Sequence, residues 1–159
     1  MINNFLKGIV DLFYQTNSKR KNYERNNPTE KVLAADGTKG IKTKNQDEIK
    51  RGPEWIAAQR AVVMLTQDRI ICGKWSISLD KIQQSDLVIV KTILGSGQIL
   101  KISTTDGDNF QFGMQFNPEW SNQNTLKLNI QNGKVKTSLF SWVLRIGLIA
   151  YLIYLFFIK

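Results

Sequence analysis

Residues Gln98–Met114, QILKISTTDGDNFQFGM, carry the clearest fold signal in this sequence. In the second half of the stretch, Phe110, Phe112 and Met114 alternate with other residues, which is the period of a β-strand with one buried face. Asp106-Gly107 separates this run from QILKIST, and Asp-Gly between two such runs is a strong signal for a tight hairpin. The stretch therefore predicts two antiparallel strands joined by a turn.

Four similar runs precede this hairpin, and residues typical of turns separate them. Each run is short and rich in β-branched or other apolar residues. The runs are AVVML (61–65), RIIC (69–72), WSISL (75–79) and LVIVKTIL (87–94). With the hairpin they give about six antiparallel strands, and such a meander has to curl into a small barrel or sandwich to cover its apolar face.

The segment that follows the hairpin, 117–132, carries two conflicting signals. Asn117-Pro118-Glu119 is typical of a helix start, because it combines an N-cap residue, a first-turn proline and an early acid. Leu126, Leu128 and Ile130, however, alternate as in a strand. Asn132-Gly133 would end a helix or turn a hairpin equally well. The local pattern leaves both structures open.

Four motifs in this region, taken in order, resemble the pleckstrin-homology-like (PH-like) fold of GRAM domains and bacterial PH-type domains. They are LTQDRIIC (65–72), ISLDKI (77–82), LKISTTDGDNFQF (100–112) and NPEW (117–120). The resemblance implies a mainly β domain over 52–131, with a small antiparallel PH/GRAM-like barrel closed by a helix that begins near Pro118. The first strand of that fold is not evident, because DEIKRGPEWIAAQ (47–59) is compatible with a helix as well.

The N-terminal segment 1–16 is predicted to form an amphipathic helix, because its apolar residues recur at helical spacing. The face that they form consists of Ile2, Phe5, Leu6, Ile9, Val10 and Phe13. This face either packs on the chain's own domain or docks on a membrane or a partner protein, helped by Lys19, Arg20 and Lys21. Residues 17–51 are polar and poor in large apolar side chains, so we expect a basic flexible linker there.

Residues 138–158 are predicted to form a transmembrane helix, because about twenty residues from Leu139 are apolar on every helical face and match the bilayer thickness. Arg145 reaches back to the headgroups beside Lys134 and Lys136, or it faces an acidic partner within the membrane. The basic flank places the domain on the cytoplasmic or equivalent organellar side. A buried core helix is the alternative. The predicted anchor residues are Trp142, Arg145, Tyr151, Tyr154 and Lys159.

Composition argues against several kinds of site. The chain has no histidine, which removes the usual base near neutral pH and the commonest transition-metal ligand. Its single cysteine, Cys72, allows no internal disulfide, and Gly73-Lys74 does not complete a phosphate-binding motif. We therefore expect no enzyme activity, no cofactor and no metal. The net charge of +9 suits an anionic lipid surface and needs no nucleic acid to explain it.

These patterns predict a non-enzymatic, tail-anchored, single-pass membrane adaptor. It would be an accessory or assembly factor that binds a larger membrane protein complex through its PH-like domain and its helices. The alternative is recognition of lipid headgroups by the domain itself. Candidate headgroup contacts are Lys19, Arg20, Lys21, Lys74, Lys81, Lys91, Lys101, Lys134 and Lys136. Lysines on strands are also typical of sheet edges that avoid pairing with other chains.

Overall fold

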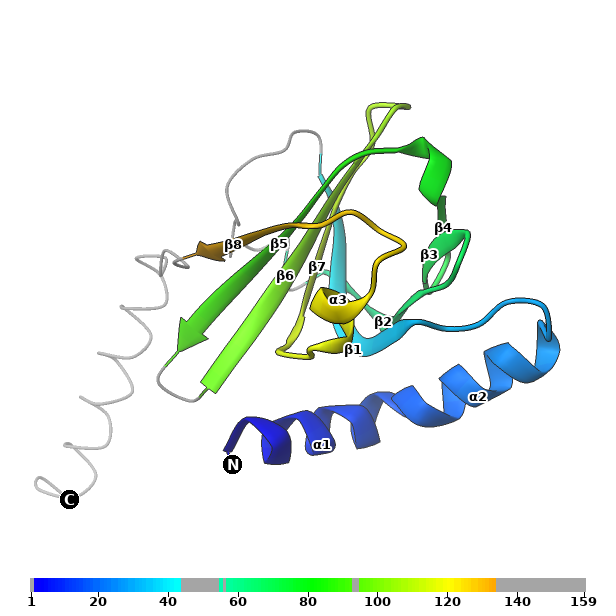
Figure 1. Cartoon of the computed structure of the whole chain (residues 1–159). Helices are drawn as coiled ribbons and strands as arrows, with labels where there is room; N and C mark the ends of the chain where they lie inside the picture. The colour runs from blue at the N-terminus through cyan, green and yellow to red at the C-terminus, as the bar shows by residue number, and fades with distance from the viewer. Residues whose placement is uncertain (1, 44–54, 56, 93–94, 134–159) are drawn as a thin grey trace, which may run out of the picture.

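The computed structural model describes residues 2–43, 55, 57–92 and 95–133, and the strands among them form one eight-stranded sheet that curls into a half-barrel (Figure 1). The strand order is β4-β3-β2-β1-β7-β6-β5-β8. The strands are β1 Ala34–Thr43, β2 Gln59–Leu65, β3 Arg69–Cys72, β4 Trp75–Ser78, β5 Ile82–Thr92, β6 Gly95–Thr104, β7 Asn109–Gln115 and β8 Asn129–Gly133. A single 3₁₀ turn, η2 Leu79–Lys81, joins β4 to β5. The expectation of a mainly β, barrel-like fold is confirmed.

The predicted hairpin is also confirmed. Strands β6 and β7 pair antiparallel, with Ser103 opposite Asn109. Gly107 in the turn has a φ of 83°, a backbone conformation that glycine adopts without a steric penalty. The hydroxyl of Thr104 accepts a hydrogen bond from the N–H of Asp108 at 3.2 Å and closes the turn. The runs AVVML, RIIC and WSIS likewise lie in β2, β3 and β4.

The core is divided between the two faces of the sheet. Phe112, Leu65 and Trp120 are fully buried in the main cluster, which receives side chains from β1 to β7. Val62 and Met64 alternate with core residues along β2, so they lie on the opposite face. There they form a second cluster with Val32 and Ala35, and Tyr14 and Tyr23 of the N-terminal helices pack against it.

The prediction of a flexible linker over 17–51 is wrong for residues 17–43. Helix α2, Thr16–Asn26, occupies the first part, and β1 lies between β2 and β7 near the centre of the sheet. The first strand of the domain is therefore β1. It lies upstream of the segment 47–59, in which that strand was expected. Residues 44–51 are outside the described part of the chain.

Strand β1 carries few large apolar side chains because its neighbours supply them. A Cβ on Gly37 would lie 2.6 Å from Cγ of Tyr14, so the tyrosine ring packs directly on the strand backbone. A Cβ on Gly40 would lie 2.8 Å from the ring of Trp75 and 3.0 Å from that of Phe112. Glycine thus leaves space for aromatic rings from distant parts of the sequence, which no local pattern reveals.

Segment 117–132 forms neither a long closing helix nor a hairpin. Helix α3, Glu119–Asn122, is one turn that buries Trp120, and the predicted helix beyond Asn122 is wrong. The Gln123 side chain bonds both the N–H and the C=O of Leu126 and leads the chain away from the helix. The chain then enters β8, which pairs parallel with β5, so the expectation of an entirely antiparallel sheet is corrected as well.

Within the described residues, no helix combines the length and the apolar character needed to cross a bilayer. The predicted transmembrane helix 138–158, with Trp142, Arg145, Tyr151, Tyr154 and Lys159, lies outside them. Lys134 and Lys136 lie outside them too. The anchor and its orientation therefore stay predictions from the sequence.

Candidate functional site: the N-terminal arm

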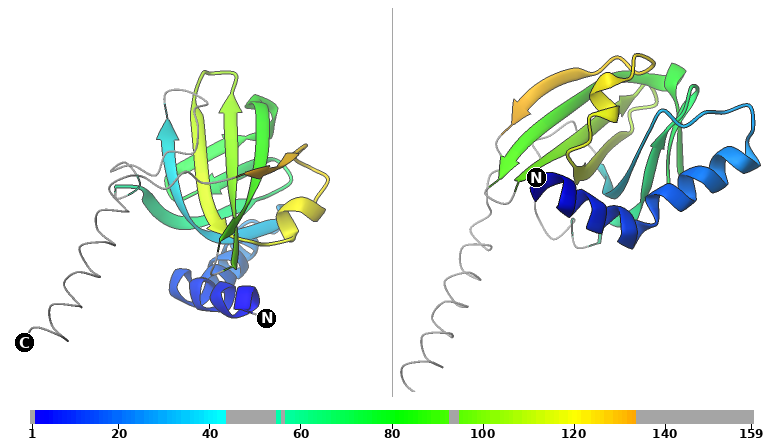
Figure 2. Two further views of the ribbon diagram at one scale, coloured as in Figure 1. Left: turned by 90° about the vertical axis from the view of Figure 1, so that its left-hand side faces the viewer. Right: turned by 60° about the horizontal axis from the view of Figure 1, so that its bottom comes forward.

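Residues 2–26 form a helical arm that runs along one side of the β domain (Figure 2, right). Its first helix, α1 Ile2–Tyr14, confirms the predicted N-terminal helix. Gln15 then adopts a left-handed conformation with a φ of 54°, and helix α2 follows. The arm contacts β1, β2, β6 and β7, so residues that are distant in sequence meet along it.

The arm is joined to the sheet by a buried ion pair between Lys7 and Asp36. Lys7 Nζ lies 2.8 Å from Oδ1 of Asp36, a β1 carboxylate that is only 1% exposed. The other oxygen, Oδ2, accepts hydrogen bonds from Nδ2 of Asn117 at 2.8 Å and from Nε1 of Trp120 at 3.0 Å. Three donors from two distant parts of the chain, α1 and residues 117–120, therefore converge on one carboxylate, which a buried charge requires.

The pKa values of this pair reflect the competition between burial and charge. Burial raises the pKa of Asp36 above its ordinary value, and the hydrogen bond and charge of Lys7 oppose that rise. For Lys7, burial acts to lower the pKa, but the carboxylates of Asp36 and Asp11 outweigh it, so the pKa is raised. Asp11 lies 2.9 Å from the same amine, one helical turn along. Lys7 is thus held in its charged form against the domain.

A second polar connection links α2 to α3. Nη1 of Arg20 donates to Oε1 of Glu119 at 2.9 Å, and Nη2 donates to the carbonyl of Val32 at 2.7 Å. Oε2 of Glu119 accepts the backbone N–H of Ala35 at 3.2 Å. The cation predicted as a headgroup contact, Arg20, is therefore engaged in holding the arm to the sheet.

The side of α1 that faces the β domain combines polar side chains with Val10 and Tyr14, and two large apolar side chains, Leu12 and Phe13, face away from the domain. Lys7, Asp11 and Tyr14 are half-buried. Leu12 is 78% exposed and Phe13 82% exposed. An exposed pair of this kind is unusual, because amphipathic helices ordinarily turn their apolar stripe to the core.

In the structure, some residues of the predicted docking face are exposed and another is half-buried. Ile9, 37% exposed, and Phe13 point away from the domain, whereas Val10 is half-buried. The side chains of Ile2, Phe5 and Leu6 lie outside the described residues. Leu12, which shares the apolar recurrence of this segment, is also part of the exposed apolar surface.

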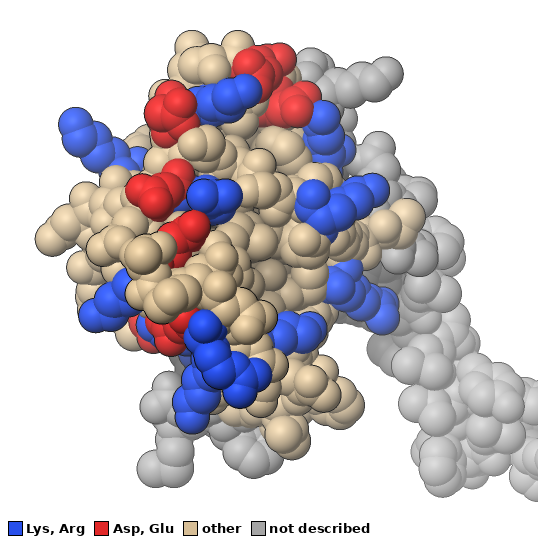
Figure 3. Space-filling view, turned by 90° about the vertical axis from the view of Figure 1, so that its right-hand side faces the viewer, with Lys and Arg blue, Asp and Glu red and all other residues tan. Residues whose placement is uncertain are grey.

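The lysines proposed to bind headgroups on the β domain are not brought together. Lys74 lies in the turn between β3 and β4, whereas Lys81 lies beyond the other end of β4 and pairs with Asp106 at 2.9 Å. Lys91 is ten residues from Lys81, toward the far end of β5. On the side of the molecule that carries β3, β4 and the end of α2, basic side chains are spread over the surface with acidic ones among them (Figure 3).

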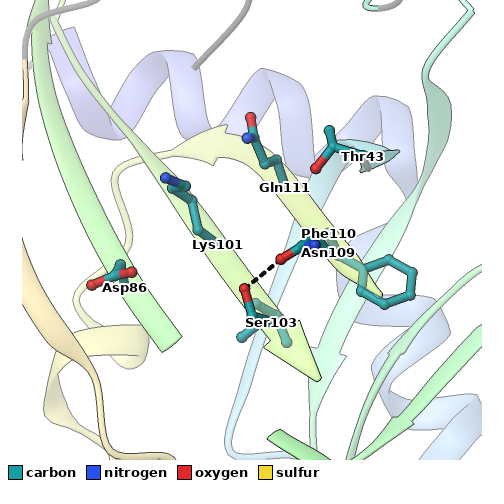
Figure 4. A pocket seen from close by; sticks show the side chains of 8 residues that line it. Thr43, Asp86, Lys101, Ser103, Asn109, Phe110 and Gln111 are labelled. Carbon is teal, nitrogen blue, oxygen red and sulfur yellow. Dashed lines mark hydrogen bonds between the residues drawn. The ribbon is translucent and has the colours of Figure 1, made fainter. Parts of the chain in front are cut away.

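A small pocket on the outer face of β5, β6 and β7 contains the remaining candidate, Lys101 (Figure 4). Ser103 donates a hydrogen bond to Asn109 at 2.6 Å across this pocket. The carboxylate in the pocket lining is that of Asp86, which is buried and lies opposite Lys101 in the strand register. It accepts hydrogen bonds from the side-chain amides of Gln84, Asn129 and Gln131. These bonds attach β8 to the sheet, so the group has a structural role.

Among the described residues, no cluster of three acidic, cysteine or histidine side chains is arranged to hold a metal ion. Burial raises the pKa of the Cys72 thiol to about 12, so the thiol is not a nucleophile near neutral pH. Comparison with protein-family models, curated proteins and solved structures gave no match for this chain. Its function is therefore inferred from its own residues.

Sequence reasoning missed most of the residues that fix the arm. Asp36 and Lys7 were not singled out, because their pairing joins positions 29 residues apart. Asn117 and Glu119 were recognised only as a helix start. The available signal was an aspartate between small residues in AADG (34–37), which is typical of a turn and gave no indication of burial.

Proposed function

We propose that this chain is a non-enzymatic adaptor of a membrane, an accessory or assembly factor for a larger membrane protein complex. The C-terminal segment 138–158 would anchor it, with the β domain on the cytoplasmic or equivalent organellar side. The β domain and the arm would then present their surfaces to the complex. In this role the protein acts by position and needs no catalytic group.

The orientation of the arm is the observation that carries this proposal. A helix that serves only its own domain would turn its apolar stripe inward, but α1 turns Leu12 and Phe13 outward and anchors itself through Lys7. The exposed surface therefore calls for an apolar environment outside the domain. A second membrane-seeking segment at the other end of the chain makes that environment available.

The buried carboxylates support a structural rather than a catalytic domain. Asp36 fixes the arm and Asp86 fixes β8, and hydrogen-bond donors already surround each of them. The half-barrel supports a PH/GRAM-like module, whose motifs the sequence carries, although α3 has a single turn where that resemblance implies a longer closing helix. Fold alone does not assign a function, so this likeness supports only the architecture of the proposed module.

Crosslinking in native membranes, read by mass spectrometry, tests the proposal directly. We expect crosslinks from lysines of the arm and the β domain to subunits of one membrane complex, and co-migration with that complex in mild detergent. Washing the membranes with alkaline carbonate should leave the protein in the pellet. Release by carbonate, or migration as an isolated protein with no reproducible crosslinked neighbour, would contradict the proposal.

A further inference from the structure

We infer that the outward surface of the arm binds an anionic lipid bilayer, with α1 and α2 lying along the plane of the headgroups. This inference rests on the proposed function, because the C-terminal anchor would keep the arm close to the bilayer. It adds a second attachment point and names the lipid chemistry that this attachment recognises.

The apolar part of this surface is formed by α1. Ile9, Leu12 and Phe13 lie at helical spacing and point away from the sheet. On the same helix, a Cβ at Gly8 would meet nothing within 4 Å, so this part of the arm is open to its surroundings. A leucine and a phenylalanine exposed side by side on a helix are suited to the boundary between headgroups and acyl chains.

The charged part of the surface is formed by α2. This helix carries four basic residues and one acid, and Lys19, Lys21 and Arg25 are exposed on it. The acids of the arm are turned inward, because Asp11 pairs with Lys7 and Glu24 accepts the backbone N–H of Val32 at 3.1 Å. The surface that faces away from the domain is therefore basic, which favours phosphate-bearing anionic lipid.

Apolar and basic residues are thus arranged in succession along one arm of about 37 Å. A second copy of this chain would bring the same basic helices close together, which charge repulsion opposes. An apolar groove of a protein would accommodate Leu12 and Phe13 but would not explain the basic surface of α2. An anionic bilayer satisfies both parts of the arm at once.

Site-directed spin labelling of the full chain in vesicles tests the inference. The native Cys72 is buried, so a nitroxide on Leu12→Cys reports the arm alone. A label on Thr105→Cys is the control, because the β6–β7 turn lies at the other end of the sheet from the arm (Figure 1). In vesicles of phosphatidylglycerol and phosphatidylcholine, we expect the Leu12 label to become accessible to oxygen and protected from a water-soluble nickel complex, and the Thr105 label to stay in water.

Vesicles of phosphatidylcholine alone test the role of charge. The Leu12 label should return to water in them, and immersion that is equal in both lipids would overturn the anionic preference. In the anionic vesicles, Lys21→Glu should lower the ratio of immersed to free arm about tenfold, whereas the matched change Arg60→Glu on β2 should leave it unchanged. An equal loss from Arg60→Glu would overturn the inference, because the effect would then follow from net charge alone.

The same samples separate this inference from the proposed function. If the C-terminal segment does not anchor the chain, the protein will be washed from the vesicles before any label is read. If the chain stays in the vesicles while the Leu12 label remains in water, the adaptor role survives and the lipid contact of the arm is refuted. A label hidden from both oxygen and nickel, and released by dilution in lipid, would assign the surface to a second copy.

Discussion

At the scale of single residues, Asp36 connects parts of the chain that are distant in sequence. It lies in β1, nearly without solvent contact, and its oxygens join the arm, the segment before α3 and Trp120. A buried carboxylate is tolerated only when its partners are complete, and removing one partner leaves an unpaired buried charge. Lys7 is the partner with the compensating charge.

Replacing Lys7 by methionine should therefore destabilise the protein by about 3 kcal/mol, because Asp36 would stay buried without its cation. Urea unfolding followed by tryptophan fluorescence measures this loss. The double variant Lys7→Met/Asp36→Asn should recover part of it, since an amide needs no counter-charge. Equal stability of Lys7→Met and the unmodified protein would show that the ion pair does not stabilise the docked arm.

Tyr23 gives the arm a dependence on alkaline pH. Burial, followed by the hydrogen bond to Glu30 at 2.6 Å, raises its pKa to about 12. A raised folded pKa means that its contribution is complete below the ordinary value of 10 and is lost as the pH rises toward 12. The melting temperature should fall between pH 10 and 12, and Tyr23→Phe should make that fall smaller. An identical fall in the variant would assign the effect to other groups.

At the scale of elements, β1 and α1 are fitted together by a glycine. The backbone of β1 approaches the ring of Tyr14 so closely at Gly37 that a methyl group has no room there. Glycine in a strand ordinarily costs stability, so this one is retained for contact rather than for conformation. The position where the arm crosses the sheet depends on that contact.

Gly37→Ala should destabilise the protein by about 1–3 kcal/mol, because the new methyl overlaps the Tyr14 side chain. Gly97→Ala on β6 is the matched control, since its nearest neighbour would be the Met114 carbonyl at 3.4 Å, an ordinary contact. Thermal unfolding compares the two. A loss of stability from Gly37→Ala that Tyr14→Ala does not relieve would mean that the clash lies elsewhere.

At the scale of the whole molecule, the arm covers the domain on one side and exposes an apolar surface on the other. Tyr14 and Tyr23 pack against the cluster of Val32, Ala35, Val62 and Met64, while Leu12 and Phe13 point outward. Both properties belong to one segment. The domain is therefore incomplete without the arm, and experiments on function require the full chain.

Deleting residues 1–26 should lower stability by at least about 3 kcal/mol, because Val62 and Met64 lose their cover. The melting temperature should fall and binding of a hydrophobic dye should rise. Leu12→Ser/Phe13→Ser, in contrast, should change stability by less than about 0.5 kcal/mol, since both side chains are exposed in the folded protein. A large destabilisation by the double serine variant would show that these residues are covered in solution.

Local sequence patterns were enough to predict the antiparallel strands from β2 to β7, the turn at Asp106-Gly107 and the amphipathic character of α1. These signals are local, because alternation, turn chemistry and helical period each lie within a few neighbouring residues. They were sufficient to predict a mainly β, curled domain. They failed at β1, whose glycines and buried aspartate were interpreted as a linker.

Long-range contacts in the folded protein, in contrast, set which side of α1 meets the domain and how the chain continues after Pro118. The first depends on Lys7 reaching Asp36, and the second depends on Asp86 binding the side chains of β8. Both are contacts between residues that are distant along the chain, and their free energy depends on burial that exists only in the folded state. No periodic pattern in the sequence indicates such contacts.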